Sequence, residues 1–156
     1  MTWLSRFACG GGVLLMLVGC GESGDEGPQS PLNEEQARDR AGEHINETVT
    51  ALPDSLELER LGGSSAPCEN DEYITVSKRY WLDGLPAEEN EEHVEALHEY
   101  WSANGYTVEA DQRPDDQFIS VRHDEDKFTM SVRESKQGDL SLGASSPCID
   151  ENGTDG

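Results

Sequence analysis

The sequence predicts an α+β fold, a two-layer sandwich in which a mainly antiparallel sheet is covered on one face by two helices. Two segments carry apolar residues at helical spacing, and four segments in the C-terminal half alternate apolar and polar residues with a period of two. An antiparallel sheet with one apolar face needs a covering layer. The two helices are the only long apolar-sided segments available for that layer, so we expect them on the same face.

The first helix is expected from Asn33, where Asn33 and Gln36 have the spacing of a capping box, to Leu52, just before Pro53. Its apolar side is made of small and medium residues, which are Ala37, Ala41, Ile45, Val49 and Leu52. Such a helix packs as a cover on the sheet. A short strand is expected at 56–59, followed by a loop at 62–67.

The second helix is expected from Pro86 or Ala87 to Ala103 and follows a β-branched and aromatic strand at 73–82. Its apolar side holds Val94, Leu97, His98 and Trp101. A stop at 104–105 fits Gly105 in the left-handed region, with Tyr106 against Trp101. The alternating strands are expected at 106–110, 119–122, 128–132 and 140–144, with hairpin connections at 123–126 and 135–139.

The N-terminal segment has the layout of a secretory signal peptide. Residues 1–19 contain one basic and no acidic residue, and their apolar run is shorter than the roughly 20 residues that a spanning helix needs. The run ends in Leu17-Val18-Gly19-Cys20, which resembles the lipobox of bacterial lipoproteins. We therefore expect cleavage before Cys20 and lipidation of its thiol, which places the chain on the outer side of a cell membrane through an N-terminal lipid. An ordinary signal peptide with an incidental cysteine is the alternative.

The remaining chain divides by composition into three parts. Residues 20–31 read as a disordered acidic tether, 32–149 as a single α+β domain, and 150–156 as a disordered tail. The full chain has 33 acidic and 11 basic residues and a net charge of −22. Such a charge repels phosphate polymers, so we expect no nucleic-acid partner. The acidity fits either a high-salt habitat or a self-repelling envelope protein.

Two cysteines remain after the signal peptide and the lipidation site. Cys68 and Cys148 lie 80 positions apart in a chain expected in an oxidising compartment, so they should form a disulfide. Two isolated cysteines make a poor zinc site.

Several of these features together resemble a family of small actinobacterial lipoproteins. They are the lipobox, the acidic tether, the helix end Trp101-x3-Gly105-Tyr106-x-Val108 and the closing Ser146-Pro147-Cys148. This chain departs from the family in carrying fewer basic residues around the second helix. The resemblance supports location and fold, and it implies no activity.

Motifs for catalysis are missing from the sequence. His93 and His98 lie five positions apart, which does not suit one metal ion, and no HExxH, GxSxG or SxxK pattern occurs. His44 and His123 are expected to be structural or exposed, and His98 a core histidine. The acidic runs 124–126 and 150–156 are incomplete as calcium loops. We expect no metal site, no cofactor and no catalytic residues.

The best candidates for a partner contact lie near the end of the 73–82 strand. Lys78 and Arg79 precede Tyr80 and Trp81, and one of the two rings must point away from the covered face. That ring is either a contact or covered by the following loop. The sequence thus favours a non-enzymatic lipoprotein that binds an unidentified envelope protein or ligand. The alternative is an extracytoplasmic enzyme built around His98 and a carboxylate.

Overall fold

The computed structural model describes residues 27–154 of the chain, which form two helices, two short 3-10 turns and six strands. Asn33 caps the first helix through the expected capping box with Gln36. The elements in chain order are α1 (Glu34–Thr48), η1 (Val49–Ala51), β1 (Glu57–Pro67), β2 (Ile74–Asp83), η2 (Ala87–Glu89), α2 (Asn90–Ala103), β3 (Tyr106–Asp111), β4 (Phe118–His123), β5 (Thr129–Glu134) and β6 (Leu140–Ser145).

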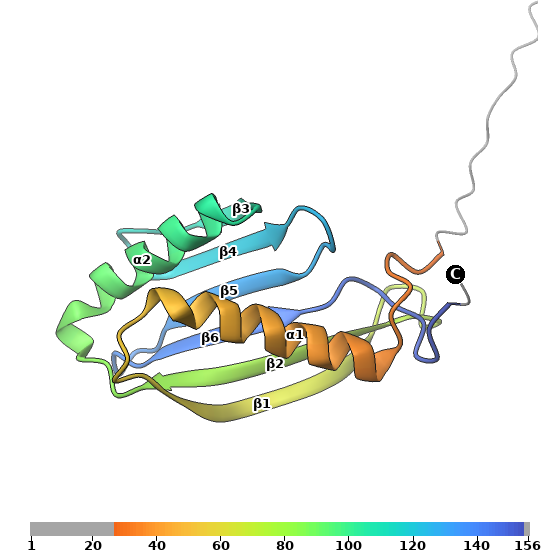
Figure 1. Cartoon of the computed structure of the whole chain (residues 1–156), viewed down its shortest axis with the longest axis horizontal. Coiled ribbons are helices and arrows are strands. Elements are labelled where there is room, and N and C mark those ends of the chain that lie inside the picture. Colours follow the sequence, from red (N-terminus) through yellow and green to blue (C-terminus); the bar gives the residue numbers. More distant parts are fainter. Residues whose placement is uncertain (1–26, 155–156) are drawn as a thin grey trace, which may run out of the picture.

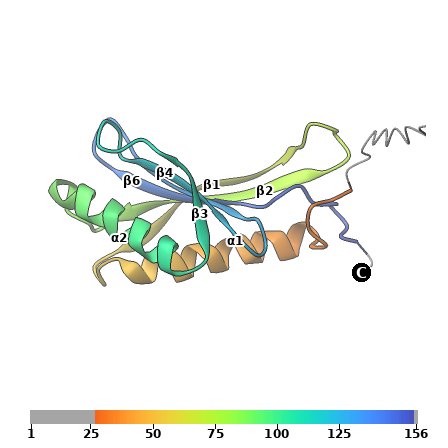
Figure 2. The same ribbon diagram turned by 90° about the horizontal axis from the view of Figure 1, so that it is seen from above.

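The six strands form one antiparallel sheet in the order β1-β2-β6-β5-β4-β3. Both helices lie on the same face of this sheet, and the other face is uncovered (Figures 1 and 2). Strands β3 to β6 follow one another as a meander, and β2 then pairs with β6. The predicted α+β sandwich is therefore confirmed, including the covering helices.

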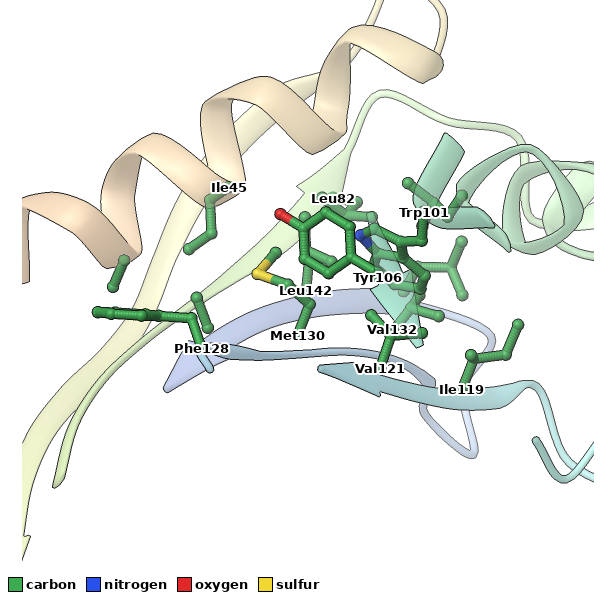
Figure 3. Close-up of a cluster of buried hydrophobic side chains, with 14 of the residues drawn as sticks. Ile45, Leu82, Trp101, Tyr106, Ile119, Val121, Phe128, Met130, Val132 and Leu142 are labelled. Carbon is green, nitrogen blue, oxygen red and sulfur yellow. The ribbon is translucent and has the colours of Figure 1, made fainter. Parts of the chain in front are cut away.

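The core lies between the helices and the inner face of the sheet. Trp101 from α2 and Ile45 from α1 meet side chains of β3 to β6 there, as Figure 3 shows for Tyr106, Met130 and Leu142. Ala37 and Ala41 are fully buried, so α1 approaches the sheet closely through small residues. The indole of Trp101 donates to the hydroxyl of Thr48 at 3.2 Å, which joins the two helices.

The strand β1 differs from the sequence prediction. A strand was expected only at 56–59, whereas β1 runs over 11 residues and pairs with β2 along its length. The segment Gly62-Gly63-Ser64-Ser65 has low strand propensity, and its extended form depends on that pairing. A bulge between Arg60 and Gly62 shifts the register, as is common on edge strands.

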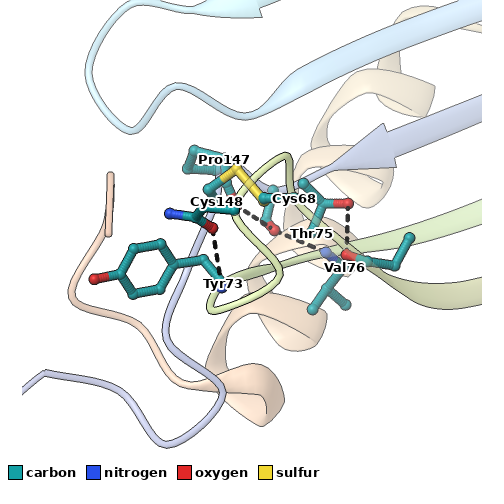
Figure 4. Close-up of a disulfide and its surroundings, with 9 residues drawn as sticks. Cys68, Tyr73, Thr75, Val76, Pro147 and Cys148 are labelled. Carbon is teal, nitrogen blue, oxygen red and sulfur yellow. Dashed lines mark hydrogen bonds between the residues drawn. A yellow bond between two sulfur atoms is a disulfide. The ribbon is translucent and has the colours of Figure 1, made fainter. Parts of the chain in front are cut away.

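A disulfide joins Cys68, before β2, to Cys148, after β6 (Figure 4). The predicted pairing is therefore confirmed. Backbone bonds between Ile74 and Ile149, each donating to the other at 2.9 and 2.8 Å, continue the sheet past the disulfide.

Parts of the predicted tether and tail make backbone contacts within the described residues. Gln29 donates to the carbonyl of Cys148 at 2.8 Å, and Thr154 donates to that of Pro31 at 3.2 Å. Residues 27–31 and 150–154 thus pair with each other and with the start of α1. Within residues 27–154, no helix combines the length and the apolar character that a membrane span requires.

Candidate functional site

The uncovered face of the sheet, here called the open face, is lined mainly by small polar residues. Cross-strand pairing aligns its outward positions in three rows. The rows, from β1 toward β3, are Glu59-Trp81-Ser141-Arg133-Phe118, Gly62-Arg79-Gly143-Ser131-Ser120-Ala110 and Ser64-Ser77-Ser145-Thr129-Arg122-Thr107. Figure 2 shows the sheet curving away from the helices toward both ends, which makes this face concave.

Arg79 lies across the middle of the open face. Its guanidinium donates to the hydroxyls of Ser141 at 3.0 Å and Ser131 at 2.7 Å, on two different strands. Gly143 leaves the space for it, since a Cβ at that position would lie 2.5 Å from the Nη2 of Arg79. Burial, together with the charge of Arg133, lowers the pKa of Arg79.

Two aromatic residues, Phe118 and Trp81, also lie on the open face. The Arg133 guanidinium carbon lies 4.6 Å from the centroid of the Phe118 ring, a cation–π contact. Trp81 is half-buried, and it points outward because its neighbours Tyr80 and Leu82 belong to the core side. A concavity of about 350 Å³ adjoins Arg79 and is bounded by Leu61, Ser77 and Ser145 among others.

The four predicted contact residues are divided between the two faces. Trp81 and Arg79 lie on the open face, whereas Tyr80 packs against the core and Lys78 points toward α1. The sequence required one of the two rings to face outward, and that ring is Trp81. Lys78 and Tyr80 therefore do not line the open face, because residues of the same strand alternate between faces.

A second polar cluster lies inside the molecule between α1 and the β4–β5 hairpin, and the sequence did not predict it. His44 is fully buried; its Nε2 lies 2.9 Å from Oδ2 of Asp126 and its Nδ1 lies 2.5 Å from the hydroxyl of Tyr106. His123 Nδ1 lies 2.8 Å from Oδ1 of the same carboxylate. Arg40 donates to Asp126 Oδ2 at 2.7 Å.

The partners of His44 assign its protons. A carboxylate accepts only, so His44 donates from Nε2 to Asp126 and accepts the Tyr106 hydroxyl proton at Nδ1. Burial lowers the pKa of His44, which favours this neutral form. Although burial alone would raise the pKa of Asp126, hydrogen bonds from Arg40 and His44 lower it to about 2. Burial raises the pKa of Tyr106.

These residues are also the types that ligate metals. Atoms of His44, His123 and Asp126 lie within 4.8 Å of one another. Zinc at about 2.0–2.1 Å from each ligand would need them closer and would compete with Arg40 for the carboxylate. Each of the three groups already has a hydrogen-bond partner in the cluster. The arrangement therefore suits a structural hydrogen-bond network better than a metal centre.

The histidines of α2 differ from the sequence prediction. His98, expected in the core, has a side chain 30% exposed and lies 3.8 Å from the carboxylate of Glu95, one turn earlier. His93 is buried instead. The helix is rotated so that its inward residues are His93, Val94, Leu97 and Trp101. The apolar positions 94, 97 and 101 are compatible with either His93 or His98 on the buried side, so the sequence did not decide between the two histidines.

Cys20 and the whole expected signal peptide lie outside the described residues. Comparison of the chain with known protein families, curated proteins and solved structures finds no match. The proposals below are therefore argued from the residues themselves.

Proposed function

We propose that this protein is a lipid-anchored, extracytoplasmic binding module with no catalytic role, which presents its open face to a ligand. The anchoring part follows from the Leu17-Val18-Gly19-Cys20 pattern at the end of an apolar leader. Two acyl chains on Cys20 would hold the protein stably on a membrane. Its similarity to small actinobacterial lipoproteins in the same pattern supports this location.

The observation that carries the binding role is the composition of the open face. A surface sheet face that has no function other than solvation is expected to share the acidic character of this chain, which has 33 acidic and 11 basic residues. The middle of the open face instead carries serines, threonines and Arg79, and the half-buried Trp81 lies toward its border, opposite Glu59. Exposed tryptophan and arginine are the residues that most often dominate binding surfaces.

The enzyme alternative has less support from the geometry. His98 and Glu95 are neighbours on one helix and face solvent on the outer side of α2. A general base works best in a site that also holds its substrate. The contact between His98 and Glu95 offers no such enclosure, so we favour binding.

Fractionation of cells that express the full chain tests the anchor. Wild-type protein should sediment with membranes, and the Cys20→Ala variant should not be released from its leader or labelled by a palmitate analogue. Cleavage of the leader and palmitate labelling that are unchanged in Cys20→Ala would contradict the anchor.

Thermal unfolding tests the binding role without a known ligand. A small-molecule extract of the native host should raise the melting temperature of the wild-type chain, because a ligand that binds only the folded state stabilises it. Trp81→Ala should lose the increase while keeping its own melting transition. An equal increase in both proteins would contradict binding at the open face.

A further inference from the structure

Three arginines lie on the open face of an otherwise acidic chain. Along β2, β6, β5 and β4 its outward positions hold Arg79, Arg133 and Arg122. The acidic residues of this face gather at its borders. Glu57, Glu59 and Asp83 lie at one corner on β1 and the end of β2, and Glu109 lies on the opposite edge strand.

The three arginines differ in whether a carboxylate balances them. Arg122 forms an ion pair with Glu109 at 2.7 Å. Among residues 27–154, neither Arg79 nor Arg133 has a carboxylate partner; Arg79 bonds only serine hydroxyls and Arg133 lies over the Phe118 ring. Two other partly buried arginines, Arg40 and Arg113, are each paired with acids.

Arg79 is a half-buried guanidinium without an anion, and the positive charge of Arg133 acts on it. Arg79 is packed on Gly143 and bonded to Ser141, which is the cross-strand partner of Arg133. Charges removed from water are normally paired, which applies to the half-buried Arg79. An anion placed over this part of the sheet would reduce the repulsion between the two cations and accept hydrogen bonds from both.

We propose that the Arg79–Arg133 pair on the open face binds the phosphate group of a small phosphate monoester whose ring or apolar body lies against Trp81 or Phe118. This inference rests on the proposed function and names its ligand class. A phosphate monoester carries close to two negative charges at neutral pH, which matches the two unpaired guanidiniums. The serine hydroxyls of the same rows supply further hydrogen bonds.

Net charge decides between a small ligand and a polymer. A chain of net charge −22 repels a nucleic acid or an anionic membrane at long range. At physiological salt the repulsion is screened beyond about 8 Å. The electrostatic energy of a small anion close to the open face is therefore determined mainly by the two nearby arginines.

Isothermal titration of the full chain, purified from membranes in non-ionic detergent, tests the proposal with phenyl phosphate at constant ionic strength and pH 7.5. We expect saturable binding at one site. Arg79→Gln and Arg133→Gln should each weaken it at least tenfold. Arg122→Gln, on the same face but paired with Glu109, is the matched control and should change it less than twofold.

Two further variants and two further probes complete the test. Gly143→Ala keeps every charge but displaces Arg79, and it should also weaken binding about tenfold. Arg133 is exposed, so Arg133→Gln remains informative if the more buried Arg79 variant unfolds. Inorganic phosphate should bind more weakly than phenyl phosphate because it lacks the ring. Benzoate should bind more weakly because it carries a single charge.

The proposal is overturned if phenyl phosphate does not bind, if neither Arg79→Gln nor Arg133→Gln weakens it, or if benzoate binds as tightly. In that event a melting-temperature increase from host extract that depends on Trp81 would leave the binding module standing with another ligand. If phenyl phosphate does not bind and no Trp81-dependent increase in melting temperature is found, the proposed binding role is contradicted as well.

Discussion

His44 is the buried centre of a network that joins α1 to the β4–β5 hairpin. Asp126 accepts hydrogen bonds from Arg40, His44, His123 and the backbone of Phe128, so one carboxylate binds two donors from α1 and two from the β4–β5 hairpin. An unpaired donor left in such a place costs more than the bond itself is worth. Replacing Asp126 should therefore destabilise the protein more than replacing any other residue of this network.

We predict that Asp126→Asn lowers the free energy of unfolding by about 2–4 kcal/mol, because Arg40 and His44 lose their anionic partner. Urea unfolding at pH 7 measures the change. The exposed Asp115 provides a control, and Asp115→Asn should stay within about 0.5 kcal/mol of wild type. Equal stability of the two variants would show that the network contributes nothing.

The lowered pKa of His44 predicts a specific pH dependence of stability. At pH values between the folded pKa of His44 and its ordinary value of 6.5, the imidazole is protonated in the unfolded chain and neutral in the folded chain. Stability from this group is therefore present above pH 6.5 and is lost as the pH falls below it. Comparing wild type with His44→Gln isolates the effect from the many carboxyl groups.

Urea unfolding at pH 8 and pH 5 checks this sign. The wild-type chain should lose more stability between the two pH values than His44→Gln, which keeps a donor toward Asp126 but cannot titrate. A larger loss in His44→Gln would mean that His44 is charged in the folded state and stabilised by Asp126.

The sequence contains little that could have revealed this network. His44 lies beside the apolar positions Ala37, Ala41 and Ile45 of its helix, and His123 and Asp126 lie in a hairpin 79 and more positions later. Their meeting depends on the angle at which α1 crosses the sheet, which periodicity does not encode. The His123 to Asp126 spacing within one hairpin was the only local signal.

At the scale of elements, α1 depends on small side chains for its close contact with the sheet. Ala37 and Ala41 are fully buried, and the first lies one turn before the second. Larger residues at these positions would push the helix away from β2 and β6. A close approach of this kind is sensitive to volume because protein interiors are packed densely.

Ala41→Leu should therefore reduce the free energy of unfolding by about 1–3 kcal/mol through overpacking. Asp39→Leu, on the exposed side of the same helix, adds the same side chain where space is available. Thermal or urea unfolding of both variants makes the comparison. A stable Ala41→Leu would indicate that α1 packs more loosely than described.

The helices, the meander and the disulfide could be predicted because their signals are local or, for the cysteines, a matter of elimination. The length of β1 could not, since Gly62-Gly63-Ser64-Ser65 becomes a strand only by pairing with β2. The separation of Lys78 and Tyr80 from Arg79 and Trp81 follows from strand alternation. The sequence predicted that one of the two rings, Tyr80 or Trp81, faces outward, but it did not determine which one.

At the scale of the molecule, the disulfide closes a loop that contains most of the sheet. Cys68 and Cys148 are separated by 80 positions. The Cys68→Ser/Cys148→Ser variant should be less stable than wild type by about 2–5 kcal/mol, with about 4.5 kcal/mol from chain entropy. Unfolding of wild type with reductant should match the variant, and an unchanged stability in both would contradict the role of the disulfide.

The net charge of −22 also acts on the whole molecule. Salt screens repulsion between exposed carboxylates, so the melting temperature should rise between low salt and molar sodium chloride. Differential scanning calorimetry at a fixed pH measures it. A flat response would show that surface repulsion is already offset by the ion pairs of the folded chain.

Mass spectrometry of the N-terminal peptide from protein purified out of native membranes tests the central claim most directly. The account predicts a peptide that begins at Cys20, with a diacylglyceryl group on its sulfur. An unmodified Cys20 thiol, or a peptide that still carries residues 1–19, would contradict it.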